Sequence, residues 1–142
     1  MLTTNQKGLI AESAVIAECA RLGVLVSIPL ADARYDLVLD VGRLLRVQCR
    51  WASVDRDVVR VRLYSARRGA DGMITRRYEP DEIDCFAAHC GELGRTYLLP
   101  RDLCQFREVR LRLGPARNNQ EARIRWAKDY EFAARLVELQ GP

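Results

Sequence analysis

Lysine is nearly absent from this sequence. Of its 23 basic residues only Lys7 and Lys128 are lysines, and the others are arginines. The planar guanidinium of arginine suits phosphate groups and the edges of guanine. A net charge of +4 and an isoelectric point near 9.0 favour a nucleic-acid partner. That charge is weak support by itself, since many soluble proteins of similar charge bind no polyanion and arginine richness also follows from a GC-rich genome.

A closely spaced set of cysteine and histidine residues is missing as well. The five cysteines are an odd number and include no CxxC pair, and His89 is the only histidine. This pattern excludes a zinc site of the usual ligand spacing and indicates buried thiols in a reducing compartment. We expect His89 to be a core or interface histidine.

The sequence also lacks long apolar runs, repeats and low-complexity tracts. No run approaches the ~20 apolar residues that span a bilayer, and no signal peptide precedes Leu9. We therefore expect a soluble, cytoplasmic protein. Its 142 residues, of which 49% are hydrophobic and 30% charged, fit one globular domain over residues 1–142.

Apolar residues recur with helical spacing near both ends of the chain. Thr4 and Asn5 offer capping oxygens before a first helix at residues 9–22, which Gly23 is placed to end. A second helical pattern covers residues 120–140.

The segments between these two helices favour strands, and residues 41–43 form a connection of hairpin length. The polar segment 65–80 is predicted to be a loop. Because helices and strands do not alternate regularly, the class is α+β or mixed α/β. The predicted strands cover residues 24–28, 35–40, 44–52, 58–64, 83–90, 96–99 and 109–113.

Glu12 carries a carboxylate on an apolar side of the first predicted helix. Helical spacing places it with Gly8, Ile16 and Cys19. A carboxylate in that setting needs a partner, which is a metal ion, an arginine, or water at the helix edge. For Glu12 taken alone, an edge position or a salt bridge is the usual explanation.

The predicted strand 44–52 has one unusually polar face. Alternation places Arg46, Gln48 and Arg50 on that face, and the hairpin can bring Asp36 of the preceding strand beside them. An acid, an amide oxygen and a cation near a glutamate form the kind of cluster that binds a divalent ion beside a phosphate. An exposed polar strand face with ordinary salt bridges explains the same pattern about equally well.

The order of these motifs resembles the PD-(D/E)XK endonucleases, in particular the branch associated with group I introns, which includes small homing endonucleases. The resemblance covers nearly the whole chain and implies a restriction-endonuclease-like core, in which helices flank a central mixed β-sheet. It is carried by Lys7-Gly8 ahead of Glu12, by Tyr35-Asp36, by Gln48-x-Arg50, and by residues 82–84, 97–100, 118–120 and 124–130.

The resemblance also implies a divalent-metal site, with Mg²⁺ as the ion and Mn²⁺ as a substitute. Asp36 and the backbone carbonyl of Cys49 stand at the metal-ligand positions, and Glu12 supports the metal or its waters. Gln48 stands where most of the superfamily has an acid, and its amide oxygen can orient water or ligate the ion.

Arg50 departs from the family pattern, which has a lysine at this position. A lysine can lose a proton, whereas a guanidinium cannot, although it can still stabilise negative charge in a transition state. The catalytic set implied by the resemblance is Glu12, Asp36, Gln48 and Arg50. With arginine in place of lysine, activity is either reduced or lost.

Double-stranded DNA is the partner implied by the resemblance, since the residues themselves do not distinguish DNA from RNA. Arginine, asparagine and glutamine make paired contacts to base edges, and a helix N-terminus attracts phosphate. Asn118 and Asn119 are also good helix N-cap residues, so one of them is expected to cap the last helix and not to contact DNA. The predicted DNA contacts are Lys7, Arg110, Arg112, Arg117, Asn118, Asn119 and Gln120.

Three functions fit the sequence. The first is a metal-dependent DNA endonuclease of homing or repair type, with reduced activity because of Arg50. The second is a catalytically inactive DNA-binding module that retains the nuclease fold, and the third is a structural or assembly protein whose arginines form a solvated face. An enzyme this small that cuts both strands is expected to act as a homodimer or larger homo-oligomer.

Overall fold

The computed structural model describes residues 1–115 and 123–140, and it begins with the long helix α1, Thr4–Arg21. Thr3 is the N-cap: its hydroxyl accepts from the Gln6 N–H, and the Gln6 side chain accepts from the Thr3 N–H. The prediction that Thr4 or Asn5 caps the helix is therefore wrong, because this reciprocal pair lets the helix begin one residue earlier. The predicted end at Gly23 is confirmed by its positive φ of 73°.

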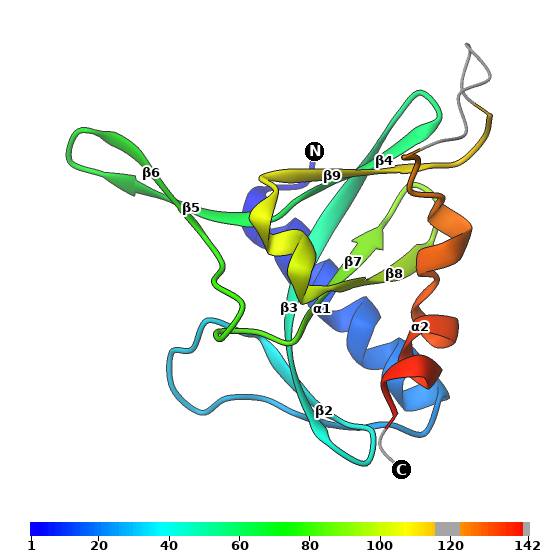
Figure 1. Ribbon diagram of the computed structural model, residues 1–142. Coiled ribbons are helices and arrows are strands. Elements are labelled where there is room, and N and C mark those ends of the chain that lie inside the picture. The colour runs from blue at the N-terminus through cyan, green and yellow to red at the C-terminus, as the bar shows by residue number, and fades with distance from the viewer. Residues whose placement is uncertain (116–122, 141–142) are drawn as a thin grey trace.

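A seven-stranded mixed sheet forms the centre of the protein, which confirms the α+β prediction (Figure 1). The path β1-β2-β3-β4-β9 is antiparallel, whereas β7 pairs in parallel with β3 and then antiparallel with β8. The strands are β1 (Leu25–Ser27), β2 (Leu37–Asp40), β3 (Leu44–Asp55), β4 (Val58–Arg62), β7 (Cys85–Cys90), β8 (Arg95–Pro100) and β9 (Glu108–Arg112).

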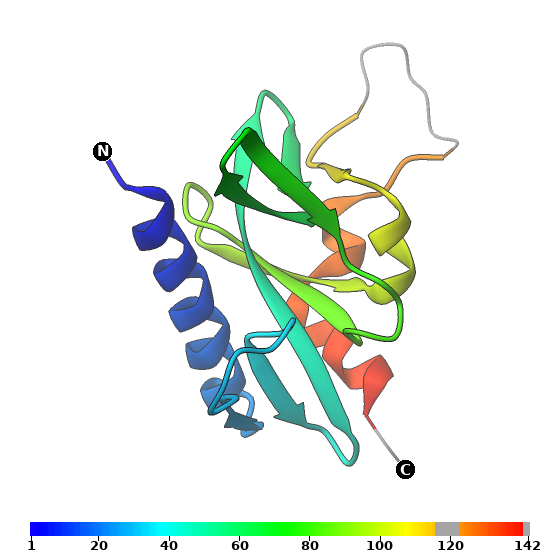
Figure 2. The ribbon, with the colours of Figure 1, turned by 90° about the vertical axis from the view of Figure 1, so that its left-hand side faces the viewer.

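The two faces of the sheet are buried by different partners. Val15 and Cys19 of α1 pack against one face, which Phe132 and Leu136 of helix α2 (Phe132–Leu139) also cover. The other face packs against the short 3-10 helix η1 (Arg101–Gln105) and against Tyr78. Figure 2 shows α1 along one side of the sheet and η1 on the other. Burial of both faces fixes the register of β3, because a slip by one residue would expose its apolar side chains.

Residues 65–80, predicted to be a loop, contain a second sheet. β5 (Tyr64–Gly69) and β6 (Gly72–Arg77) pair as an antiparallel hairpin. Every residue of β6 is exposed, so neither face of the hairpin needs the apolar alternation by which strands are predicted.

The helix predicted at residues 120–140 is much shorter than expected. The described part contains a 3-10 turn, η2 (Ala127–Tyr130), followed by α2. Glu131 separates them with φ −55° and ψ 133°, a conformation that is not helical, and it forms a bridge with Tyr97 of β8. Pairing with the sheet therefore overrides the helical pattern at this point. The early part of the prediction, residues 120–122, lies outside the described residues.

All five cysteines are buried and unbridged, which confirms the prediction of buried thiols. Within the described ranges, no helix is both long and apolar enough to cross a membrane.

Candidate active site

Two neighbouring strands diverge from one edge of β3, and the candidate site lies where they separate. β2 pairs with β3 as far as Val47, and β4 pairs with it from Ala52 onward. Both of these residues also pair with β7, so β2 and β4 lie on the edge of β3 opposite β7. Between them, residues 48–51 have no strand partner on that edge in the described part of the chain. Those backbone groups of residues 48–51 that point to this edge are therefore available to side chains or ligands, whereas the others face β7.

Asp36 fills this gap. Its N–H donates to the Val47 carbonyl over 2.9 Å, and its Oδ2 accepts from the Cys49 N–H over 3.0 Å. The N–H and C=O of one strand residue point to the same edge, so the Cys49 carbonyl also faces the gap. The structure thus brings Asp36 and the backbone of Cys49 together, as predicted.

Glu12 approaches the site from α1. It lies beside the buried stripe formed by Ala11, Val15 and Cys19 and is itself half-buried. Burial raises the pKa of the Glu12 carboxyl, and the negative charge of Asp36 raises that pKa further. The two acids are therefore near enough to interact.

Asp36 is also held in a setting that disfavours its charge. Burial raises the pKa of Asp36, although the N–H of Cys49 and the charge of Arg50 both act to lower it. A cation between the two acids would stabilise both charged forms.

Gln48 and Arg50 lie on the other face of β3, and both are half-buried. The Arg50 Nε donates to the Arg62 carbonyl over 2.9 Å, and its Nη2 donates to the Tyr64 carbonyl over 3.0 Å. Burial lowers the pKa of Arg50 from its ordinary value. Two of the three guanidinium nitrogens therefore bind the backbone where β4 leads into β5.

The site offers oxygen donors that suit Mg²⁺ or Mn²⁺, namely two carboxylates and a backbone carbonyl. Within residues 1–115 and 123–140, no three His, Cys, Asp or Glu side chains cluster in an arrangement that could hold a metal ion. A divalent ion would therefore depend on the Cys49 carbonyl and on water as well as on Glu12 and Asp36. These donors fit a hard cation that keeps several waters.

A groove beside the gap carries mostly positive charge. It has a volume of about 420 Å³ and runs between the start of α1 and strands β3 and β4. The Lys7 ammonium lies 6.0 Å from the centre of the Trp51 ring. The lining residues are Thr4, Lys7, Gly8, Cys49, Arg50, Trp51, Ser53, Arg60, Arg62 and Glu108.

Comparison with known proteins identifies the family. A family model described as PD-(D/E)XK endonuclease matches residues 2–133 of the chain. The chain belongs to the PD-(D/E)XK endonuclease family. Members of this family generally use divalent metal ions. A search of curated proteins gives no significant match.

A solved structure has the same fold as this PD-(D/E)XK protein. It is that of the bacterial homing endonuclease I-Ssp6803I, which is 27% identical and superimposes with a TM-score of 0.75. The match covers 96% of this chain and 93% of that chain. The predicted restriction-endonuclease-like core is thereby confirmed.

The predicted DNA contacts of this PD-(D/E)XK protein fall into three groups. Lys7 lies in the cationic groove. Arg110 and Arg112 point away from the buried side of β9, where Arg110 pairs with Glu108 and Arg112 donates to the carbonyls of Gly114 and Pro115. Arg117, Asn118, Asn119 and Gln120 lie outside the described residues.

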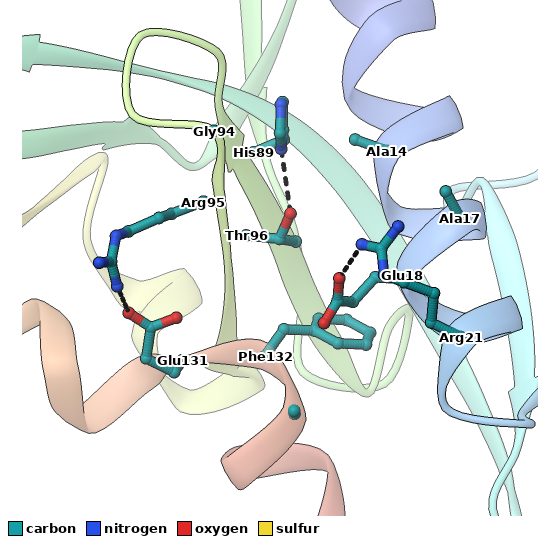
Figure 3. A pocket seen from close by; sticks show the side chains of 11 residues that line it. Ala14, Ala17, Glu18, Arg21, His89, Gly94, Arg95, Thr96, Glu131 and Phe132 are labelled. Atoms are coloured by element: carbon teal, nitrogen blue, oxygen red, sulfur yellow. Dashed lines mark hydrogen bonds and ion pairs between the residues drawn. The ribbon is translucent and has the colours of Figure 1, made fainter.

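A second hollow, between α1 and the start of α2, has charged groups that pair with each other (Figure 3). Glu18 pairs with Arg21, and Glu131 pairs with Arg95 over 2.8 Å. The His89 Nδ1 lies 3.0 Å from the Thr96 hydroxyl, and burial lowers the pKa of this histidine. Glu18 and Glu131 therefore already have arginine partners.

Two residues near the site were not predicted from the sequence. The Arg34 guanidinium stacks on Tyr78 at 4.1 Å and donates to Glu82 over 2.9 Å. Tyr78 is buried and adjoins Arg50. Arg34 stands two residues before Asp36, so its position in the family motif is the one sequence feature that could have indicated its place near the site. Tyr78 lay in a segment interpreted as a loop, where no pattern indicated burial.

Proposed function

We propose that this protein is a divalent-metal-dependent DNA endonuclease, with Mg²⁺ as the resident ion and Mn²⁺ as a substitute. The gap on β3 is the observation that supports this most directly, because Asp36 binds the Cys49 N–H where no strand occupies the edge, and Glu12 of α1 is near enough for the charge of Asp36 to raise its pKa. Membership of the PD-(D/E)XK family and the likeness to a bacterial homing endonuclease support a nuclease acting on DNA. The ion would polarise the scissile phosphate.

Each side chain of the site then has a role. Asp36, Glu12 and the Cys49 carbonyl would hold the ion. Gln48 orients the attacking water through its amide oxygen. Arg50 places a positive charge beside the phosphate and offsets the charge that develops there.

Arg50 supports a second candidate function, a DNA-binding module without catalysis. Its Nε and Nη2 are bound to backbone carbonyls, so the guanidinium has an evident structural purpose that does not involve phosphate. A guanidinium also cannot act as a base. In this alternative the fold and the cationic groove serve binding alone.

A plasmid-nicking assay with Mg²⁺, Mn²⁺ or EDTA, beside a gel shift, separates the two functions. We expect wild type to nick with either metal. Asp36→Ala should lower the nicking rate by more than about 10–100-fold, which is the usual cost of removing a residue that only supports a metal ligand. DNA binding in EDTA should stay within a few-fold, because Asp36 is not a phosphate anchor. Undiminished nicking by Asp36→Ala would place the active site elsewhere.

Arg50→Lys completes this test. We expect its cleavage to stay at or below that of wild type, because one ammonium cannot hold both carbonyls in the geometry of the guanidinium. Cleavage above wild type would instead show that the site lacks only its family lysine. If wild type, Arg50→Lys and Asp36→Ala are all inert yet bind DNA, the binding module is correct.

A further inference from the structure

The β5–β6 hairpin stands apart from the rest of the protein. Among the described residues it pairs with no strand of the seven-stranded sheet, and Figure 1 shows it projecting from the body. Side chains on β6 are exposed over its whole length. A two-stranded hairpin without a covered face is marginal in water, so this arm gains little from its own packing.

The surface of this arm is cationic on both faces. Neither strand contains an acidic residue, and Asp71 lies in the turn. The register places Arg67 opposite Ile74 and Arg68 opposite Met73, so adjacent rungs present an arginine to opposite faces. Nearer the base, Arg76 pairs with Glu82 over 3.1 Å and Arg77 donates to the Gln105 carbonyl over 2.8 Å, so the unpaired positive charge of the arm among the described residues is that of Arg67 and Arg68.

Two arginines from the candidate site hold the base of the arm. Arg50 binds the carbonyls of Arg62 and Tyr64, on the strand that leads into the arm. Arg34 donates to the Ser65 hydroxyl over 3.2 Å and to the Arg77 carbonyl over 3.1 Å, and thereby joins the two strands of the arm. Because Arg34 lies two residues before Asp36, and Arg50 one residue after Cys49, the direction of the arm is fixed relative to the gap.

We propose that the β5–β6 arm enters the major groove of duplex DNA beside the scissile phosphate, and that Arg34 and Arg50 are positioning residues that set its direction. The proposal rests on the proposed function for its choice of partner. A two-stranded ribbon fits the major groove, and strands of this length span about 20 Å. Arginines on both faces of the arm suit a DNA groove, because phosphates line both of its walls. A protein partner would contact only one face of the arm.

The arm is tested by the salt dependence of binding to a random-sequence DNA duplex in EDTA, which makes the readout independent of metal. We expect Arg67→Gln/Arg68→Gln to weaken binding and to reduce the slope of log K against log salt by about one unit per lost phosphate contact. Arg21→Gln/Arg95→Gln removes the same charge at the second hollow and should change the slope less. An unchanged slope in the arm variant, or equal losses in both variants, would overturn the proposal.

The positioning role is tested by hydrogen exchange in the absence of DNA. We expect Arg34→Met and Arg50→Met each to speed exchange of the arm amides by at least about tenfold, while amides of β7 keep wild-type protection. If Arg50→Met does not fold, Arg50→Lys provides the weaker form of the same test. If the folded variants exchange their arm amides at the wild-type rate, Arg34 and Arg50 do not hold the arm in place. Calorimetry of Mg²⁺ binding reports on the metal site separately, so failure of the arm and failure of the nuclease assignment remain distinguishable.

Discussion

The two acids of the candidate site lower the stability of the metal-free protein. Both Glu12 and Asp36 have a raised pKa, chiefly because of burial. The unfolded chain therefore releases these protons at lower pH than the folded protein does. Stability falls as pH rises from the ordinary carboxyl pKa through the raised folded-state pKa, and above both values the penalty is complete. A bound cation would reverse this loss of stability, because it stabilises the charged form of both acids.

Asp36→Asn is therefore expected to raise the thermal midpoint of the metal-free protein at pH 7. The amide oxygen can still accept from the Cys49 N–H, and the buried charge is gone. The gain should shrink near pH 4, where the wild-type carboxyl is largely protonated. Thermal melts in EDTA from pH 4 to 8 measure both effects.

Mg²⁺ should stabilise wild type but not this variant. The expected gain for wild type is about 2.7 kcal/mol when the ion is present at 100 times its dissociation constant. Asp32→Asn is a matched control in an exposed part of the same loop. A variant that loses stability in EDTA and keeps the Mg²⁺ response would contradict the metal site.

Helix α1 determines where Glu12 lies. The capping box of Thr3 and Gln6 fixes its first turn, and Gly23 ends it with a positive φ. Because the helix packs on the face of β3 that carries Cys49, a change in its start would move Glu12 relative to the gap.

Thr3→Ala removes the capping hydroxyl and is expected to destabilise the protein by about 1 kcal/mol. Thr4→Ala is the matched control, because Thr4 is the first helical residue and alanine is a good helix former. Urea unfolding of both variants measures the difference. An equal loss of unfolding free energy in Thr3→Ala and Thr4→Ala would show that the Thr3 hydroxyl does not stabilise the helix as a cap.

The whole chain has one candidate site among its described residues, whereas the proposed cleavage of duplex DNA requires two cuts. Symmetric assembly is the simplest solution, since a twofold axis places two copies of the site on antiparallel strands. We expect analytical ultracentrifugation to give at least about twice the mass of the 16.2 kDa chain when DNA is bound.

The course of plasmid cleavage checks the same expectation. An assembly with two sites should produce linear DNA early, whereas a monomer would accumulate nicked circles before any linear product. A chain that sediments as a monomer on DNA and only nicks would contradict the expected homodimer or larger assembly.

Much of the candidate site follows from local pattern. The alternation of β3 places Gln48 and Arg50 on one face, and the hairpin connection brings Asp36 to the same strand, as the structure shows. These relations depend on residues close in sequence. Glu12 was predicted through its place in the family motif, since helical spacing alone allowed an ordinary salt bridge.

Local pattern in the sequence is enough to predict the α+β class, the end of β2 at Asp40, the start of β3 at Leu44 and the buried thiols, because each depends on periodicity or composition that neighbouring residues carry. The gap on β3, the arm and the length of α2 depend instead on how distant segments pack together. The gap exists because β2 and β4 pair with different parts of one strand edge, and the arm is held at its base by Arg34 and Arg50 from distant segments. Contacts between segments far apart in the chain leave no periodic signal, so these features could not be predicted from local pattern.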